Sequence, residues 1–368
     1  MLDVVIIGAG PAGISSALKC AENGYNTLII EEGKGIKPCG GIAPLALLSD
    51  LKQKLGLKMP LSLLSYPKML GLFYVPPSGK EKGGFVKGYK LLNIDRCLFN
   101  EWLRLVTKDR DIPILFNAKF IKFQEEKEHI KVFIKKDDAI LKIKTKHLIG
   151  ADGVFSRVRK QIYPNLDMNV TAILQEYWDA KGDVNEFFYI FFRKAITPTY
   201  GYVIPKNKLF IIGTGVSKKD IGKLQDCIIK FKKWLKEEFC FKPLFLRKRE
   251  IGFVPRFAPV IGKGNIILAG DAGGFCNPFS GEGIRLAIES GASVGEALKK
   301  AELSGDFLAY AYNQCIEDIV SFILRMLDFT LSMNDEIAEE FVNNELSRNW
   351  RIEDFNCLKS YFFLLLSV

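Results

Sequence analysis

The chain has 368 residues, of which 48% are apolar and 26% charged, and this globular balance excludes wholesale disorder. Its formal charge of +10 comes mostly from scattered lysines, which favours a solvated surface; a functional basic face would suit an anionic membrane, because no nucleic-acid module is recognisable and we expect no nucleic-acid partner. The two histidines have no partner at ligand or triad spacing, so we expect no metal site and no Ser-His chemistry.

The first thirty-two residues read as a strand, a glycine turn, a helix and a second strand. The unbroken apolar run at 4–7 is typical of a parallel strand buried on both faces. Glycines at positions 8, 10 and 13 would allow a tight turn, a close approach to a pyrophosphate, and close helix packing. An acid that binds a ribose hydroxyl is expected about 20 residues on, where the second strand ends. This unit is the dinucleotide fingerprint, and its predicted cofactor-binding residues are Gly8, Gly10, Pro11, Ala12, Gly13, Glu31 and Glu32.

Targeting and redox signals point to the cytoplasm. Met1 leads directly into the first predicted strand, which leaves no room for a signal peptide. No apolar run, including the one at 361–366, reaches the roughly 18 residues that a membrane span needs. The eight cysteines lack paired spacing, which indicates reduced thiols. We therefore expect a cytoplasmic protein, peripheral to the membrane at most.

The remaining elements fall into two kinds of structure. A loop at 33–44 precedes helical patterns near 45–57 and 93–106 and strand patterns over 114–150. Residues 171–216 instead read as antiparallel sheet, followed by an amphipathic helix near 221–235. The pattern of the nucleotide domain then follows again, with a strand at 265–269 and a helix from about 281 to 297. The rest of the chain is predicted to be helical. We predict an α/β fold in which a Rossmann-like domain is discontinuous because an antiparallel substrate domain is inserted. The predicted domains are 1–60, 88–170 and 256–300 for the nucleotide, 61–87 and 171–255 for the substrate, and 301–368 for a C-terminal helical segment.

An aromatic and apolar run at 187–192 has no polar alternation, so both faces of this strand should be covered. One face can pack on the core while the other lines a cavity. We predict that the cavity is an apolar tunnel lined by Phe188, Ile190 and Phe192, with Tyr200 and Tyr202 nearby.

Four short motifs are shared with a known flavoprotein family. They are the glycine turn at 8–13, Pro-Cys-Gly-Gly at 38–41, Gly-Ala-Asp-Gly at 150–153 with Ser-Arg at 156–157, and Gly-Asp-Ala-Gly-Gly-Phe at 270–275 with Gly-Glu-Gly-Ile at 281–284. With them the chain resembles oxidoreductases built like p-hydroxybenzoate hydroxylase, and within these the geranylgeranyl reductase family. It is most similar to a short bacterial branch that includes the enterobacterial colicin M resistance protein. Two positions depart from the family pattern: Asn100 replaces an acid, and Tyr202 replaces a tryptophan.

The resemblance implies FAD as the cofactor. It places Asp271 at the ribityl chain or pyrophosphate, and it aims the helix that begins near Gly281 at the flavin, where a helix N-terminus stabilises negative charge. It also places the Cys39 thiol near the reacting centre. The further cofactor-binding residues predicted in this way are Cys39, Gly40, Gly41, Arg96, Asp152, Gly270, Asp271, Gly281, Gly283 and Ile284.

The leading hypothesis for function is an oxidoreductase that saturates carbon–carbon double bonds of a prenyl or polyprenyl lipid. An isolated alkene is not electrophilic, so hydride transfer needs help from a proton donor. Cys39, Tyr200, Tyr202 or an ordered water could supply the proton, and the sequence does not choose among them. The alternatives are an FAD-dependent monooxygenase or halogenase, and a flavin-binding lipid carrier or resistance factor without turnover.

The electron donor is open at this stage. Gly213-Thr214-Gly215 lacks the third glycine and the helix of a second nucleotide site, so we interpret it as a sheet turn. We expect either weakly bound NAD(P)H or an electron-donor protein.

Overall fold

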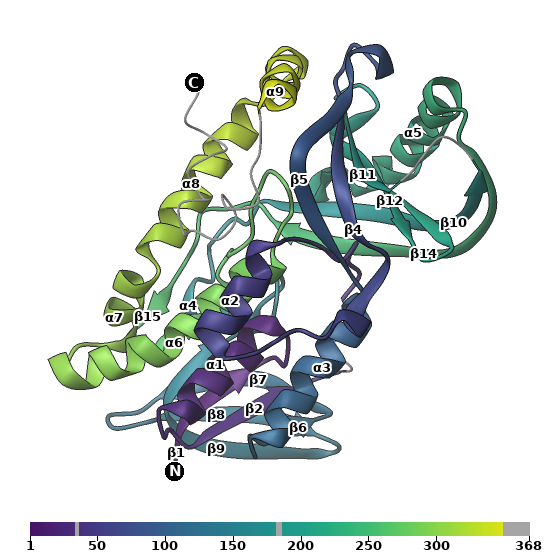
Figure 1. Ribbon diagram of the computed structural model, residues 1–368. Helices are drawn as coiled ribbons and strands as arrows, with labels where there is room; N and C mark the ends of the chain where they lie inside the picture. Colours follow the sequence, from purple (N-terminus) through teal and green to yellow (C-terminus); the bar gives the residue numbers. More distant parts are fainter. Residues whose placement is uncertain (34–36, 182–185, 349–368) are drawn as a thin grey trace.

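The computed structural model describes residues 1–33, 37–181 and 186–348, and within these ranges two eight-stranded sheets form the scaffold (Figure 1). The strands are β1 (Leu2–Ile7), β2 (Thr27–Glu31), β3 (Ile42–Pro44), β4 (Leu64–Val75), β5 (Gly84–Ile94), β6 (Ile114–Phe116), β7 (Ala118–Glu125), β8 (Ile130–Lys136), β9 (Ala139–Gly150), β10 (Val170–Lys181), β11 (Phe187–Arg193), β12 (Thr197–Lys206), β13 (Leu209–Ser217), β14 (Lys242–Pro255), β15 (Gly262–Lys263) and β16 (Ile266–Leu268). The α-helices are α1 (Pro11–Glu22), α2 (Ala46–Leu55), α3 (Arg96–Asp109), α4 (Arg157–Ile162), α5 (Leu224–Phe239), α6 (Ile284–Ser304), α7 (Leu308–Cys315), α8 (Glu317–Ser332) and α9 (Asp335–Ser347). Short 3-10 turns lie at Leu61–Leu63, Lys80–Lys82, Lys218–Lys223 and Gly270–Ala272.

The first sheet is the Rossmann-like part of the molecule. Its strand order is β15-β16-β9-β1-β2-β6, and β1 lies parallel to both β9 and β2, as its apolar run predicts. Val4, Val5 and Ile6 are completely buried, because both faces of the strand are covered. The antiparallel hairpin of β7 and β8 continues from β9.

Helices α1 and α6 pack closely on this sheet. A Cβ atom on Gly291 of α6 would lie 2.3 Å from the backbone oxygen of Ala12, so only glycine permits this approach. The contact brings the start of α6 next to the start of α1, and it therefore fixes two helix N-termini side by side.

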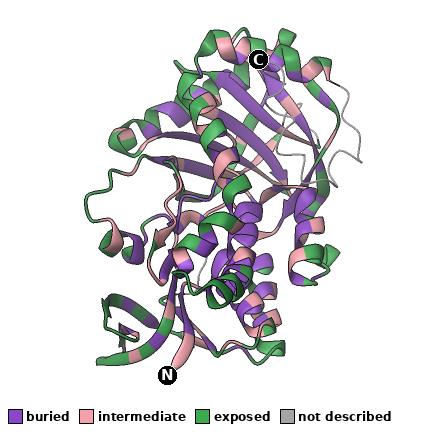
Figure 2. Ribbon diagram, turned by 90° about the vertical axis from the view of Figure 1, so that its left-hand side faces the viewer, coloured by how far each residue is buried: buried purple, intermediate pink, exposed green. Residues whose placement is uncertain are grey.

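The second sheet has the order β14-β10-β13-β12-β11-β4-β5-β3, and every pair is antiparallel except β11 with β4. Tyr189 and Phe191 of β11 pack with Phe231 and Trp234 of α5, which covers one face of this sheet. Figure 2 shows that buried residues follow the strands, while exposed residues follow the outer faces of the helices. This packing covers one of the two faces of β11 that its unbroken apolar run predicts to be covered.

The predicted fold class is confirmed, since a Rossmann-like sheet is interrupted by a largely antiparallel sheet and followed by C-terminal helices. The predicted domain boundaries stay a prediction. The two sheets do not divide the chain at these boundaries. Strand β3 at 42–44 and all of β5 at 84–94 belong to the second sheet, although 42–44 and 88–94 fall in the predicted nucleotide domain. Residues 349–368, which contain the apolar run at 361–366, lie outside the described residues. In the described ranges no helix combines the length and the apolar character needed to cross a bilayer.

Candidate cofactor and substrate site

A cavity of about 370 Å³ lies between turns that follow strands of the first sheet and the strands of the second sheet. The glycine turn, the loop at 37–41 and the start of α6 line one part, and β4, β5, β11 and β12 contribute the apolar side chains of another. Phe322 of α8 and Glu345 of α9 also line it. The cavity therefore joins a backbone-lined region to a side-chain-lined region.

The glycine turn is shaped to bring backbone against a ligand. Gly8 has a φ of +106°, and a Cβ atom on Gly13 would lie 1.9 Å from the Gly8 oxygen, so these two glycines serve the turn itself. A Cβ atom on Gly10 would meet no atom within 4 Å, and Gly10 lines the cavity. Gly10 is thus the glycine that faces open space, as expected for the position beside a pyrophosphate.

Charged groups around this part of the cavity fit an anionic cofactor. Helices α1 and α6 both begin at its wall, with Pro11 and Ile284 among the lining residues, and helix N-termini attract phosphate. Arg96, the first residue of α3, also lines the cavity, and its buried Nη1 atom has no hydrogen-bond partner among the described residues. Burial lowers the pKa of this guanidinium. A buried guanidinium nitrogen without a hydrogen-bond partner among the described residues fits the diphosphate of FAD.

Asp271 faces the same space from the turn after β16, and Lys37 forms an ion pair with it. Gly270 precedes it with a φ of +60°, and a Cβ atom there would lie 2.7 Å from the Ala12 Cβ. This close approach sets Asp271 beside the N-terminus of α1. Lys37 was not predicted from the sequence, because an isolated lysine in a loop has no motif that distinguishes it.

The loop that carries Cys39 is fixed by its glycines. Gly41 has a φ of +71°, and its oxygen accepts a hydrogen bond of 2.7 Å from the Ile94 amide. The Cys39 sulfur accepts a bond of 3.3 Å from the Gly41 amide. Lys206 donates a 2.7 Å bond to the Ile94 oxygen, and burial lowers the pKa of this lysine to about 8. Cys39 is thereby held in the cavity wall.

The predicted tyrosines line the cavity, but their protons are already engaged. The Tyr200 hydroxyl donates to the Ser280 oxygen at 2.6 Å, and the Tyr202 hydroxyl donates to Gln175 Oε1 at 3.0 Å. Burial raises the pKa of Tyr200 to about 12 and that of Tyr202 still further above its usual value. Their catalytic role stays a prediction.

Gly213 is part of β13, so the sheet turn predicted at 213–215 is wrong. A Cβ atom on Gly213 would lie 2.0 Å from the Tyr202 ring, and the glycine therefore makes room for this aromatic side chain in the middle of a strand.

The structure gathers most of the predicted site residues and leaves some outside the cavity. Phe188 and Ile190 line it, whereas Phe192 packs against Tyr74, Phe279 and Phe341. The cofactor predictions that line the cavity are Gly10, Pro11, Ala12, Cys39, Gly40, Gly41, Arg96, Gly270, Asp271, Gly281, Gly283 and Ile284.

The predicted cofactor residues outside the lining have other contacts. Gly8 and Gly13 form the turn, and the Glu31 carboxylate accepts a 2.7 Å bond from the Ala9 amide. Glu32 is at the surface in ion pairs with Lys119 and Arg157. The Asp152 carboxylate accepts bonds from the Arg157 and Val158 amides at the start of α4.

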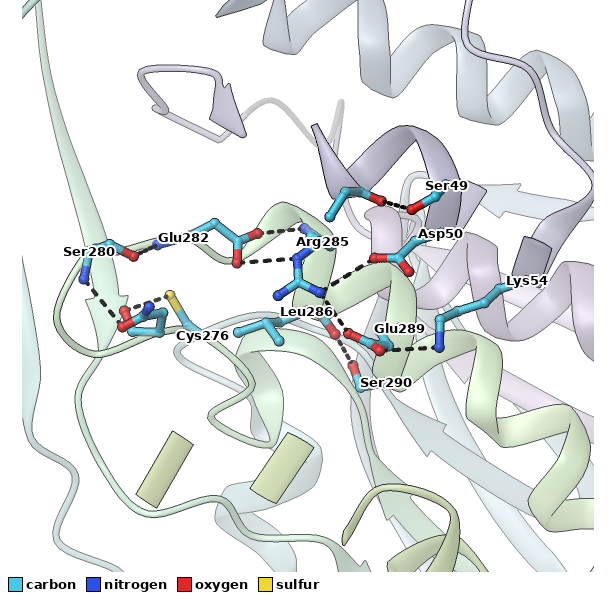
Figure 3. Close-up of polar contacts among 12 residues, drawn as sticks. Ser49, Asp50, Lys54, Cys276, Ser280, Glu282, Arg285, Leu286, Glu289 and Ser290 are labelled. Carbon is cyan, nitrogen blue, oxygen red and sulfur yellow. Dashed lines mark hydrogen bonds and ion pairs between the residues drawn. The ribbon is translucent and has the colours of Figure 1, made fainter. Parts of the chain in front are cut away.

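A group of buried charges at the cavity wall, of which Glu282 and Arg285 line the cavity, was not predicted from the sequence (Figure 3). Arg285 is 7% exposed, and its Nη1 atom lies 3.5 Å from Asp50 and 3.3 Å from Glu289. Glu289 also pairs with Lys54 at 3.1 Å. Glu282 lines the cavity and accepts a 2.9 Å bond from the Arg285 amide. A helical spacing of four residues between Arg285 and Glu289 could have indicated this pairing, but its burial depends on α2.

Comparison with known proteins identifies the family. The family model of the pyridine nucleotide-disulphide oxidoreductases matches residues 2–217. The chain is 30% identical to Protein CbrA of Escherichia coli (strain UTI89 / UPEC) over 308 residues, which are 81% of each chain. In structure it is similar to a geranylgeranyl bacteriochlorophyll reductase-like protein of Thermoplasma acidophilum, with a TM-score of 0.82 and 18% identity over 100% of this chain and 96% of that one. It is also similar to the flavin-dependent halogenase CmlS, with a TM-score of 0.67 and 15% identity over 98% and 70%.

These findings agree with the cavity, whose glycine turn, paired helix N-termini and buried Arg96 fit FAD. The family predicted from the motifs is confirmed, and so is the cofactor. The chain belongs to the pyridine nucleotide-disulphide oxidoreductase family and is an FAD-dependent oxidoreductase.

Proposed function

We propose that this protein reduces carbon–carbon double bonds in a prenyl or polyprenyl lipid. The observation that carries the proposal is a single cavity that runs from the glycine turn to the apolar side chains of β4, β5, β11 and β12. Bound FAD, once reduced by the electron donor, would supply a hydride to one carbon of the double bond. Gly10, Arg96 and Asp271 would hold the cofactor, and Cys39 would lie near the reacting centre.

The substrate part of the cavity suits a long apolar chain. Leu72, Leu91, Phe188 and Ile190 line it, and Phe279 and Phe322 add apolar surface from the helical side. Each prenyl unit that leaves water for such a surface contributes on the order of 1–2 kcal/mol of binding. The structural similarity to the geranylgeranyl bacteriochlorophyll reductase-like protein of Thermoplasma acidophilum supports the same class of substrate.

An anaerobic assay tests the proposal. The protein is reduced with dithionite and mixed with prenyl phosphates of increasing length, and the products are analysed by mass spectrometry. We expect the gain of two hydrogens for each bond reduced, and affinity that rises with chain length until the cavity is full. Absence of any saturated product would contradict the proposal. Products that form only with oxygen would favour a monooxygenase or halogenase, and bound lipid without conversion would favour a carrier.

The electron donor would bind transiently. Gly213 and Gly215 lie inside β13 and offer no second glycine turn, which supports weak binding of NAD(P)H or a donor protein. Reduction by NADPH that saturates at micromolar concentration would contradict this part of the proposal.

We also propose that an anionic membrane surface binds the edge of the second sheet. Between Lys218 and Glu250 the chain has eleven basic and five acidic residues, so this segment holds +6 of the +10 formal charge. On the edge strand β14, Leu244, Phe245 and Leu246 are 47%, 67% and 41% exposed. Apolar side chains surrounded by lysines and arginines favour anionic lipid.

Sedimentation with vesicles tests this surface. The protein should bind vesicles that contain phosphatidylglycerol, bind phosphatidylcholine vesicles weakly, and dissociate in high salt. Phe245→Ser should weaken binding, while Leu303→Ser, at an 89% exposed position of α6, should not. Equal binding of both variants would show that β14 is not the membrane surface.

A further inference from the structure

The proposed reduction needs a proton donor in the cavity wall, and the structure narrows the choice among the acids that line it. These are Asp271, Glu282 and Glu345. Asp271 already forms an ion pair with Lys37. Burial raises the pKa of Glu345 to about 7 in spite of Arg348 at 2.7 Å, but Glu345 lies beside Tyr74 on the substrate side, away from the residues that fit the cofactor.

Glu282 occupies the junction of the two parts of the cavity. Its neighbour Gly283 faces the cofactor side, since a Cβ atom there would lie 3.4 Å from Asp271 and 3.2 Å from the Cys276 sulfur. On the other side, the Ser280 oxygen accepts the Tyr200 hydroxyl from the second sheet. Two backbone hydrogen bonds of 2.9 Å hold the turn. The Asn277 amide donates to the backbone carbonyl of Glu282, and the Gly281 amide donates to the backbone carbonyl of Asn277.

The charges around Glu282 favour a state in which one of the carboxyl groups is protonated. Arg285 and Glu289 of α6 and Asp50 and Lys54 of α2 form the buried cluster behind it, with Tyr89 of β5 and Cys276 also nearby (Figure 3). Together with Glu282, the cluster has three carboxyl groups and two basic groups, so full ionisation would leave a net negative charge among these five side chains, which is unfavourable in a buried site. Burial raises the pKa values of both Glu282 and Asp50, with Arg285 opposing the rise. Of the three carboxyl groups, Glu282 is the one that lines the cavity.

We propose that Glu282 is the catalytic proton donor of this reduction, an inference that rests on the proposed function. The π bond of the alkene breaks and two C–H bonds form. One carbon takes the hydride and the other takes the proton of the Glu282 carboxyl. The carboxylate that remains is stabilised by Arg285, whose Nε atom lies 3.9 Å away and whose amide already donates to it. Water restores the proton once the product has left.

The activity test compares Glu282→Gln with Glu289→Gln. Glutamine keeps an acceptor for the Arg285 amide but loses the proton. Glu282→Gln should therefore bind FAD and be reduced by dithionite as the natural protein is, yet form saturated product about 10²–10⁴-fold more slowly. Glu289→Gln, which alters the same cluster without a residue in the cavity wall, should change the rate by less than about tenfold.

Two further readouts separate a proton donor from a structural residue. The rate of the natural protein should fall as the pH rises through the raised pKa of Glu282, since only the protonated acid donates, and this decline should vanish in Glu282→Gln. The infrared difference spectrum between the cofactor-free natural protein and Glu282→Gln should contain the carbonyl band of one protonated carboxyl, and the difference between the natural protein and Glu289→Gln should lack this band.

The outcomes distinguish the inference from the function beneath it. Turnover in Glu282→Gln equal to the natural rate, with the same pH decline, would overturn the proton donor and leave the proposed function intact. Absence of the infrared band would likewise overturn it. Failure of the natural protein to reduce any prenyl phosphate would overturn the proposed function, and the donor with it.

Discussion

The glycine turn after β1 and the strand β11 line the same cavity with different parts of the chain. At the turn, Gly10 presents backbone and the N-terminus of α1. On β11, Phe188 and Ile190 present side chains, while Tyr189 and Phe191 on the opposite face pack against α5. The first region therefore recognises its ligand with main-chain groups that every residue has, and the second with groups that substitution can change.

This difference explains why the two regions differ in how much they reveal. A backbone site requires glycines at fixed spacing, and such spacing is visible in a sequence. A side-chain site requires only apolar residues of suitable size, and many sequences meet this condition. The cofactor is thus established, whereas the lipid substrate is a proposal.

The largest effect is expected at the glycine turn. Gly10→Val should fold but lose most of its FAD, because the new side chain would fill the open space of the cavity. Gly13→Val should instead fail to fold, since its Cβ atom would overlap the Gly8 oxygen. Flavin absorbance per mole of protein and circular dichroism measure the two outcomes. Full flavin content in Gly10→Val would contradict the assignment of Gly10 to cofactor binding.

The second effect concerns the side-chain region. Ile190→Asp should keep FAD but lose the gain in affinity with prenyl chain length, which is about 1–2 kcal/mol per unit. Phe191→Leu, on the opposite face of the strand, should lower stability and keep the gain. Titration of prenyl phosphates against flavin fluorescence checks both variants. If the affinity of Ile190→Asp still rose with prenyl length, the prenyl chain would bind outside the region lined by β11.

A smaller effect is expected where the two regions meet. Cys39→Ser should bind FAD normally and turn over about tenfold more slowly, a change of about 1.4 kcal/mol in the barrier. Cys20→Ser, at a fully buried position of α1 outside the cavity lining, should leave the rate per folded molecule unchanged. Equal rates for Cys39→Ser and the natural protein would return Cys39 to a packing role.

The last effect is on stability and leaves the chemistry of both regions unchanged. Burial raises the pKa of Glu345 from 4.5 to about 7, and Arg348 only partly opposes it. The folded protein therefore holds a proton there that the unfolded chain releases, so this contribution is full below about pH 4.5 and is lost as the pH rises through about 7. Glu345→Gln should remove the dependence and be more stable than the natural protein at pH 8 by on the order of 1–3 kcal/mol. Parallel Tm–pH curves for the two proteins would refute this.

The structure of the first thirty-two residues could be predicted almost entirely from the sequence. The apolar run of β1, the glycines at 8, 10 and 13 and the acid at 31 are local in the chain, and their spacing alone predicted a strand, turn and helix. The later turn around Asp271 was also predicted from its motif, because it too is a short contiguous segment.

Tertiary structure decided what lies opposite these motifs. Glu282 and Arg285 are neighbours in the sequence, but Asp50 is more than 200 residues away, and only the packing of α6 on α2 brings the three together in one buried cluster. Phe192 is a second example. The alternation along the strand places it on the same face as Phe188 and Ile190, but Phe341 of α9 packs against it, and it does not line the cavity. Local spacing determines which backbone can fold into a cofactor turn, whereas burial and pKa depend on partners distant in the sequence, and these exist only once the chain has folded.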